Sequence, residues 1–162
     1  MSGACFSLPG APRPLLILGL GNALMSDDAV GPRAAEILAE DAELTLRADV
    51  IAGGTDLLRY MDQFAGRRRV ILIDAAESAG EPGGISIVED MPEAESAESA
   101  HALSAPGALG LLRRLMPALQ ATRFTWVLMN IGSVAAREGL SPEIAAALPK
   151  LAEAVRREAL LP

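Results

Sequence analysis

Apolar residues along this chain follow two different spacings. Continuous apolar runs occupy residues 15–18 and 70–73, and residues 124–131 are mostly apolar; such segments are typical of strands that are buried on both faces of a sheet. Residues 46–52 and 85–88 carry weaker strand patterns, the second directly after a turn rich in glycine and proline. The pattern therefore predicts five strands, and the run that begins at Leu15 is expected to be an inner one.

Between these strands the apolar residues recur at helical spacing. This spacing predicts helices that begin at about Ala29 and that cover residues 56–64, 109–116 and 142–160. The last helix has Ser141 as its expected N-cap. Because strands alternate with helices, we expect a three-layer α/β fold with a mostly parallel sheet.

The length of 162 residues suits a single domain, which we place at residues 15–162, after a loosely ordered lead-in at 1–14. Apolar residues make up 51% of the chain, yet no run is long enough to cross a membrane. The start does not resemble a signal peptide, and the single cysteine, Cys5, suits the cytoplasm. We therefore expect a cytoplasmic protein.

The net charge of −7 and an aromatic content of 3% argue against nucleic acid or an anionic membrane as a partner. Two short basic runs interrupt this acidic chain, at residues 67–69 and 113–114. We interpret both runs as solvated ends of helices. Residues 89–100 are acidic and rich in alanine and serine, which predicts a loop.

The junction at residues 17–31 carries the first candidates for chemistry. An apolar run ends in Gly-Leu-Gly-Asn, and Asp27 and Asp28 follow shortly before the helical pattern. Pro32 fits a helix only in its first turn, so the helix begins at about Ala29 or later. Asp28 is then left in the junction, where open α/β folds place their sites, and Asp27 is expected to be its structural neighbour.

Asp74 follows a second buried run, and His101 follows the acidic loop. The carboxyl ends of parallel strands share one edge of a sheet, so Asp28, Asp74 and His101 could converge there. Two carboxylates and one imidazole would suit a borderline divalent cation such as Zn²⁺ or Ni²⁺. Each residue also has a plainer interpretation: a carboxylate at a helix N-terminus, a hydrogen-bonded carboxylate at a strand end, and a solvated histidine.

Other kinds of site find less support in the sequence. No G-x-S-x-G turn surrounds the serines near His101, and Cys5 lies in the lead-in, where a thiolate is poorly held. Gly19 and Gly21 begin a dinucleotide-binding pattern, but Leu24 stands where its third glycine would be.

The motifs taken together resemble the nickel–iron hydrogenase maturation endopeptidases. The resemblance extends from about Leu15 to the last helix, with the motifs in the family's order and spacing. It is carried by Gly19-x-Gly21-Asn22, Ser26-Asp27-Asp28-Ala29-Val30-Gly31, Gly53-Gly54-Thr55, Ile73-Asp74-Ala75 followed by Pro82-Gly83, Ser99-Ala100-His101 and Gly139-Leu140-Ser141-Pro142.

The resemblance implies a twisted sheet of about five strands with helices on both faces, a phosphorylase/hydrolase-like arrangement. It also implies an endopeptidase that trims the C-terminal extension of a hydrogenase large-subunit precursor after nickel insertion. Asp28, Asp74 and His101 match the family's metal-binding positions. The nickel is expected to come with the substrate, although zinc or cadmium could occupy the site in vitro.

No dedicated nucleophile is present, so the expected attacking group is water, activated by metal or by the carboxylates of Asp28 and Asp74, which we assign as catalytic. We expect a protein that is monomeric when free. Two alternatives stay open: a nickel-dependent chaperone of the same subunit that does not cleave it, and a small nucleotide-binding α/β protein.

Overall fold

The structure, a computed structural model, describes residues 12–78, 80–91, 104–132 and 134–162. His101 and most of the acidic loop lie outside these ranges. In chain order the strands, helices and 3-10 turns (η) are β1 (Leu15–Gly19), η1 (Ser26–Ala29), α1 (Val30–Ala39), α2 (Ala42–Arg47), β2 (Ala48–Ala52), η2 (Leu57–Tyr60), α3 (Met61–Phe64), β3 (Arg69–Glu77), β4 (Ile85–Glu89), α4 (Ala105–Leu115), η3 (Pro117–Ala121), β5 (Arg123–Ile131) and α5 (Pro142–Leu160).

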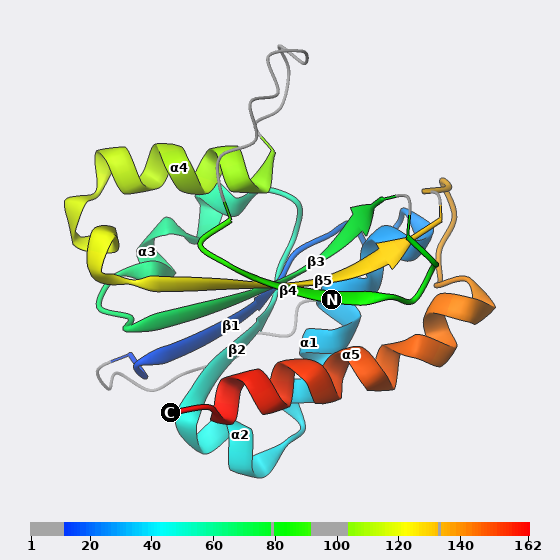
Figure 1. The fold of residues 1–162 in the computed structure, drawn as a ribbon, viewed down its shortest axis with the longest axis horizontal. Helices are drawn as coiled ribbons and strands as arrows, with labels where there is room; N and C mark the ends of the chain where they lie inside the picture. Colours follow the sequence, from blue (N-terminus) through cyan, green and yellow to red (C-terminus); the bar gives the residue numbers. More distant parts are fainter. Residues whose placement is uncertain (1–11, 79, 92–103, 133) are drawn as a thin grey trace.

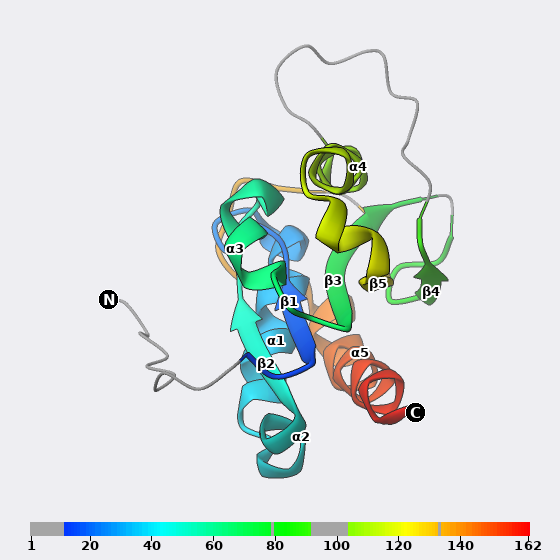
Figure 2. The same ribbon diagram turned by 90° about the vertical axis from the view of Figure 1, so that its left-hand side faces the viewer.

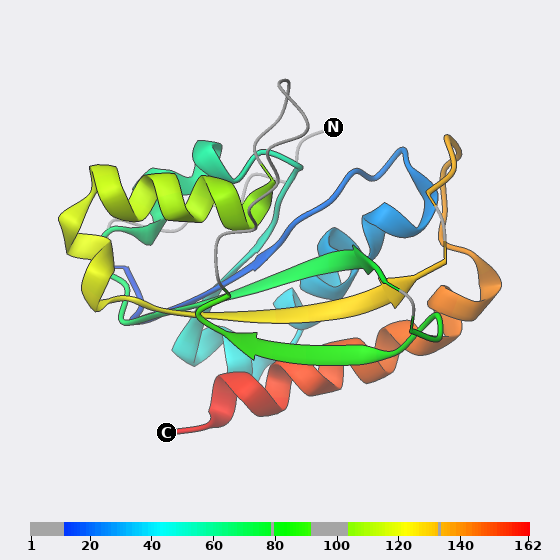
Figure 3. The same ribbon diagram turned by 45° about the horizontal axis from the view of Figure 1, so that its top comes forward.

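The strands form one sheet in the order β2-β1-β3-β5-β4. β1, β2, β3 and β5 run parallel, whereas β4 pairs antiparallel with β5 at the edge. Figure 3 shows this reversal, since the green arrow of β4 points against the yellow arrow of β5. The prediction of a mostly parallel, five-stranded sheet is therefore confirmed.

Helices cover both faces of the sheet. In Figure 1, α3 and α4 lie above it and α1, α2 and α5 lie below it; Figure 2 shows the same layers from the side. β1 is buried along its whole length, as expected for an inner strand between two layers. Its successive side chains alternate between the cores, with Ile17 on the α5 side and Leu18 on the α4 side. The three-layer α/β architecture is confirmed.

None of the helices in the described part combines the length and the apolar character that a membrane crossing requires.

The second strand begins later than its sequence pattern predicts. Residues 46 and 47 belong to α2, and β2 begins at Ala48. α2 begins after Asp41, whose carboxylate accepts the backbone N–H groups of Glu43 and Leu44 at 3.0 Å each. Leu46 is 78% exposed, so its apolar side chain does not mark a buried strand.

The interpretation of residues 67–69 as a solvated helix end is wrong for two of its three arginines. Arg67 is 6% exposed and forms an ion pair with Asp49, and it also donates to the carbonyl oxygen of Arg13 at 2.7 Å. Arg69 is 8% exposed and forms an ion pair with Glu158 near the end of α5. Both arginines are buried because carboxylates from distant parts of the chain neutralise them.

The second basic run also contains an arginine that is half-buried. Arg113 lies over the ring of Phe124, 5.0 Å from its centroid, and donates to Asp90 at 2.6 Å. The guanidinium thus covers an aromatic ring instead of being free in solvent.

Strand β3 is longer than the apolar run that predicts it. β3 continues past residue 73 and pairs with β5 as far as Glu77 and Ile131. Asp74 is therefore inside a strand, opposite Leu128, and not at a strand end. Its side chain lies on the α4 side of the sheet, since Leu72, two residues earlier, belongs to the core on that side.

Candidate functional site

Glycines bring the first turn of α1 against the ends of β1 and β3. A Cβ atom on Gly31 would lie 2.1 Å from the carbonyl oxygen of Leu20 and 2.6 Å from that of Ile73. A Cβ atom on Gly19 would lie 2.2 Å from the carbonyl oxygen of Gly31. Only glycine allows backbone segments to approach this closely. The short turn before α1 is thereby held beside β3, where Asp74 lies.

Asp28 lies in this turn, before the helix. α1 begins at Val30 with Pro32 in its first turn, so the predicted position of the helix start is confirmed. Asp28 belongs to η1, and its Oδ2 accepts the backbone N–H of Asn22 at 2.7 Å. This bond fixes the carboxylate in the loop between β1 and α1.

Asp74 carries a strongly perturbed carboxyl group. Burial, with a smaller contribution from the charge of Asp28, raises the pKa of Asp74 to about 7. The hydrogen bond from the N–H of Ala75 acts in the opposite direction and lowers this pKa. That N–H donates to Asp74 Oδ1 at 2.9 Å. The close approach of Gly31 to the carbonyl oxygen of Ile73 brings the turn that contains Asp28 next to the strand segment that contains Asp74. A divalent cation bound here would stabilise the charged form of the Asp74 carboxyl group.

The third predicted ligand, His101, lies outside the described residues. Among the residues that the structure does describe, no group of three or more His, Cys, Asp or Glu side chains is gathered to hold a metal ion. The described part thus brings together two of the three candidates, and their roles as ligands remain predictions. The nearest described element after His101 is α4, which begins at Ala105 behind its N-cap Ser104.

Gly53 and Gly54 are joined to the same loop by backbone hydrogen bonds. The N–H of Gly53 donates to the carbonyl oxygen of Gly19 at 2.8 Å, and the N–H of Gly21 donates to the carbonyl oxygen of Gly54 at 3.3 Å. The N–H of Gly54 donates to the hydroxyl oxygen of Tyr60 at 2.8 Å. No motif in the sequence singles out Tyr60. The signal that could have found it is that Tyr60 is the chain's single tyrosine and follows the glycine pair by a few residues.

Asp27 faces away from Asp28. It is 5% exposed, and its Oδ1 accepts the backbone N–H of Ser141, the N-cap residue of α5, at 2.6 Å. The two neighbouring aspartates thus have different surroundings. Asp27 is buried in a contact between distant segments, as its predicted structural role requires, while Asp28 faces the loop and Asp74.

Asn130 holds a second turn at this end of the sheet. Its Oδ1 accepts the N–H and the hydroxyl of Ser78, at 3.0 and 2.8 Å, and its Nδ2 donates to the carbonyl oxygen of Gly80. The backbone of Asn130 also bonds to that of Gly83 and Gly84. The turn before β4 is thereby fixed to β5, beyond Asp74 along the sheet.

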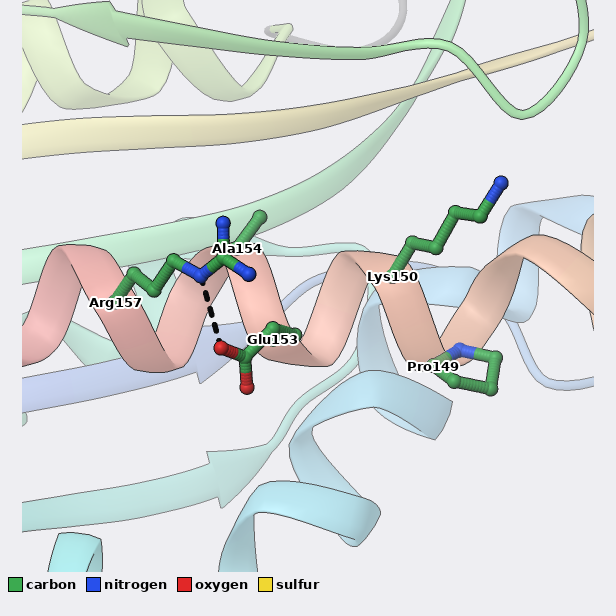
Figure 4. A pocket seen from close by; sticks show the side chains of 5 residues that line it. All are labelled: Pro149, Lys150, Glu153, Ala154 and Arg157. Atoms are coloured by element: carbon green, nitrogen blue, oxygen red, sulfur yellow. Dashed lines mark hydrogen bonds and ion pairs between the residues drawn. The ribbon is translucent and has the colours of Figure 1, made fainter.

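A depression of about 370 Å³ lies elsewhere, along the outer face of α5 (Figure 4). All of the residues that line it come from this one helix, and Glu153 and Arg157 form an ion pair at 2.8 Å among them. It shares no residue with the loop that holds Asp28 or with Asp74. We therefore do not assign the site to it.

Comparisons with known proteins agree on one family. A family model described as hydrogenase maturation protease matches residues 32–158. The hydrogenase expression/formation protein HupD of Rhizobium leguminosarum bv. viciae is 41% identical over 83 residues, which are 51% of this chain and 40% of that protein. The match thus spans less than half the length of this curated relative.

Solved structures resemble nearly the whole chain. The [NiFe] hydrogenase maturation protease HybD from Thermococcus kodakarensis is 31% identical with a TM-score of 0.72, covering 91% of this chain and 99% of its own. The hydrogenase maturating endopeptidase HybD from E. coli has the same fold, with a TM-score of 0.70 at 24% identity over 91% of this chain and 94% of its own. With a family model that matches most of its length, the chain belongs to the hydrogenase maturation protease family.

Proposed function

We propose that this protein is an endopeptidase that removes the C-terminal extension of a nickel–iron hydrogenase large-subunit precursor after nickel insertion. Family membership supports the reaction class. The observation that carries the proposal for this chain is the interaction of Asp28 with Asp74. Burial and, to a smaller extent, the charge of Asp28 raise the pKa of Asp74 to about 7. A carboxyl group with a pKa near neutrality, next to a second carboxyl group, is suited both to receiving a cation and to accepting a proton from water.

In this proposal the nickel belongs to the substrate. Asp28, Asp74 and His101 contact nickel that the precursor already holds, so that only the loaded precursor gains these contacts. A nickel ion that contacts both proteins stabilises the complex of the enzyme with the loaded precursor, because the enzyme's side chains add their binding to the metal. The nickel-free precursor would instead face two carboxylates that repel each other's charge. Cleavage would then act as a checkpoint on metal insertion.

His101 enters the proposal through the sequence and through the position of α4. Asp74 faces the α4 side of the sheet, and α4 begins four residues after His101, at Ala105. In Figure 1 the start of α4 lies above the middle of the sheet, and its end lies towards the amino ends of the parallel strands. In this proposal His101 therefore reaches Asp74 from the α4 side of the sheet.

The carboxylates of Asp28 and Asp74 are also the proposed catalytic groups. A general base works best with a pKa near the operating pH, and the pKa of Asp74 is raised to about 7. Asp74 would accept a proton from the attacking water, while Asp28 keeps its hydrogen bond to the N–H of Asn22. We place this reaction in the cytoplasm and expect the free enzyme to be a monomer.

The test mixes the purified protein with nickel-loaded and with nickel-free precursor and measures the mass of the large subunit. We expect shortening of the loaded form alone, and the His101→Ala variant should be folded but inactive. No shortening of the loaded form would overturn the endopeptidase proposal, and a stable complex without product would point to a chaperone. Equal shortening of both forms would overturn the metal checkpoint alone.

A further inference from the structure

The turn that contains Asp28 is tied to the segment between β5 and α5 at two consecutive residues, Ser26 and Asp27. The carboxylate of Asp27 accepts the N–H of Ser141 at 2.6 Å, and the N–H of Ser26 donates to the carbonyl oxygen of Arg137 at 2.7 Å. Ser26 is 2% exposed and has a φ of 45°, an uncommon value for a serine. Both partners belong to the segment between β5 and α5, more than a hundred residues later in the chain.

A buried carboxylate needs compensation for its lost hydration, and α5 supplies it. Ser141 is the N-cap of α5, a helix of 19 residues, and the N-terminus of a helix favours negative charge. The cap itself uses another atom of this residue: Ser141 Oγ accepts the N–H of Ile144 at 3.4 Å. The backbone N–H of Ser141 binds Asp27 and its hydroxyl caps the helix, so the two contacts can be removed separately.

We infer that Asp27 is a positioning residue, which holds the Ser26–Ala29 turn through the Ser141 N–H so that Asp28 is kept on its Asn22 contact beside Asp74. The consequence for cleavage rests on the function proposed above, whereas the consequence for the position of Asp28 does not. Without the Asp27 bond, the Ser26–Ala29 turn keeps only the Ser26 bond of the two that tie it to the segment before α5. The carboxylate of Asp28 then samples positions in which the Asn22 N–H is free.

Four variants separate this role from a general loss of stability. Asp27→Ala removes the acceptor, and Asp27→Asn keeps an oxygen that can accept the same N–H. Ser141→Ala removes the cap but keeps the N–H, whereas Ser141→Pro removes both. A proline suits position 141, because Ser141 has a φ of −61°.

The first measurement is hydrogen exchange of the Asn22 backbone amide, followed by NMR in the metal-free protein under conditions where circular dichroism shows a folded chain. We expect Asp27→Ala and Ser141→Pro to speed exchange at least tenfold relative to the surrounding amides. Ser141→Ala should leave it unchanged, and Asp27→Asn should restore most of the protection. Cleavage of nickel-loaded precursor is the second measurement, in which kcat should fall with KM little changed in the same two variants.

Unchanged Asn22 exchange in folded Asp27→Ala would overturn the inference. Equal acceleration in Ser141→Ala and Ser141→Pro would overturn it as well, because the helix cap would then be the cause. If the wild-type protein cleaves no precursor, the proposed function fails while the exchange data still decide the role of Asp27. If exchange responds as expected but kcat does not, Asp27 positions Asp28 without any effect on the reaction, and its link to catalysis is overturned.

Discussion

Asp28 lies in the turn after β1 and Asp74 lies within β3, and the charge of Asp28 adds to burial in raising the pKa of Asp74 to about 7. Asp28 is held by the N–H of Asn22 in the loop after β1, and Asp74 lies within β3. β1 and β3 are neighbours in the sheet, so the β1 loop opens beside the later part of β3. A protonation change at Asp74 therefore has consequences for stability and, under the proposed function, for metal binding.

The first prediction concerns stability as a function of pH in Asp74→Asn. The pKa of Asp74 is higher in the folded chain than its ordinary 3.8, so the folded state holds a proton that the unfolded state releases. This proton stabilises the fold at low pH, and the stabilisation is lost as the pH rises from about 4 to about 7. The unfolding free energy lost in this way is at most on the order of 4 kcal/mol. Asp74→Asn has no carboxyl group at this position and does not lose it.

Urea unfolding at pH 5 and pH 8 measures this effect. From pH 5 to pH 8 the unfolding free energy of the wild type should fall relative to that of Asp74→Asn. Asp62→Asn, which changes an exposed residue on α3, should follow the wild type. An equal pH dependence in Asp74→Asn and the wild type would contradict a raised pKa.

The second prediction concerns the buried ion pair between β3 and α5. Arg69 donates to the hydroxyl of Thr125 and to the carbonyl oxygen of Glu158, and it pairs with the Glu158 carboxylate. Arg69→Ala leaves Glu158 without its partner, with a side chain that is 11% exposed. We expect a loss of roughly 3–5 kcal/mol in unfolding free energy.

Arg157→Ala is the matched control on the same helix. The side chains of its pair with Glu153 are 76% and 47% exposed, so the expected loss is under about 1 kcal/mol. Chemical denaturation of both variants measures the difference. Similar losses of unfolding free energy in the two variants would contradict the burial of the Arg69–Glu158 ion pair.

The third prediction concerns the close approach of α1 to the strands. Gly31→Ala places a methyl group 2.1 Å from the carbonyl oxygen of Leu20, which the backbone must move to relieve. We expect a loss of at least about 2 kcal/mol, in line with other overpacked sites. At Gly54 the nearest atom to a new Cβ, the Tyr60 hydroxyl, is 3.9 Å away, so Gly54→Ala should change stability by under about 1 kcal/mol. Thermal unfolding compares the two, and a well-tolerated Gly31→Ala would contradict the packing of this junction.

Much of the fold follows from local patterns in the sequence. The apolar run after Pro14 predicts an inner strand, and Ser141 with Pro142 predicts the start of α5 at the residue where the structure has it. Pro32 limits the start of α1 and so leaves Asp28 in the loop. These features depend on neighbours within one turn or one strand, which is why the sequence alone reveals them.

The contacts that the sequence does not reveal join distant residues. Arg69 pairs with a glutamate 89 positions away, and Asp27 binds a backbone N–H 114 positions away. A basic run and an acidic pair look the same in sequence whether they are solvated or buried against such partners. The length of β3 was likewise hidden, because its pairing with β5 carries the strand beyond its apolar run, through Asp74.

The central claim is that Asp28 and Asp74 act together on nickel-loaded precursor. Its most direct test compares the rate of precursor shortening, followed by mass spectrometry, for the wild type, Asp28→Asn, Asp74→Asn and the exposed-site control Asp62→Asn. We predict that the control matches the wild type and that each site variant, while folded, is slower by at least about a hundredfold. Shortening at the wild-type rate by either site variant would contradict the claim.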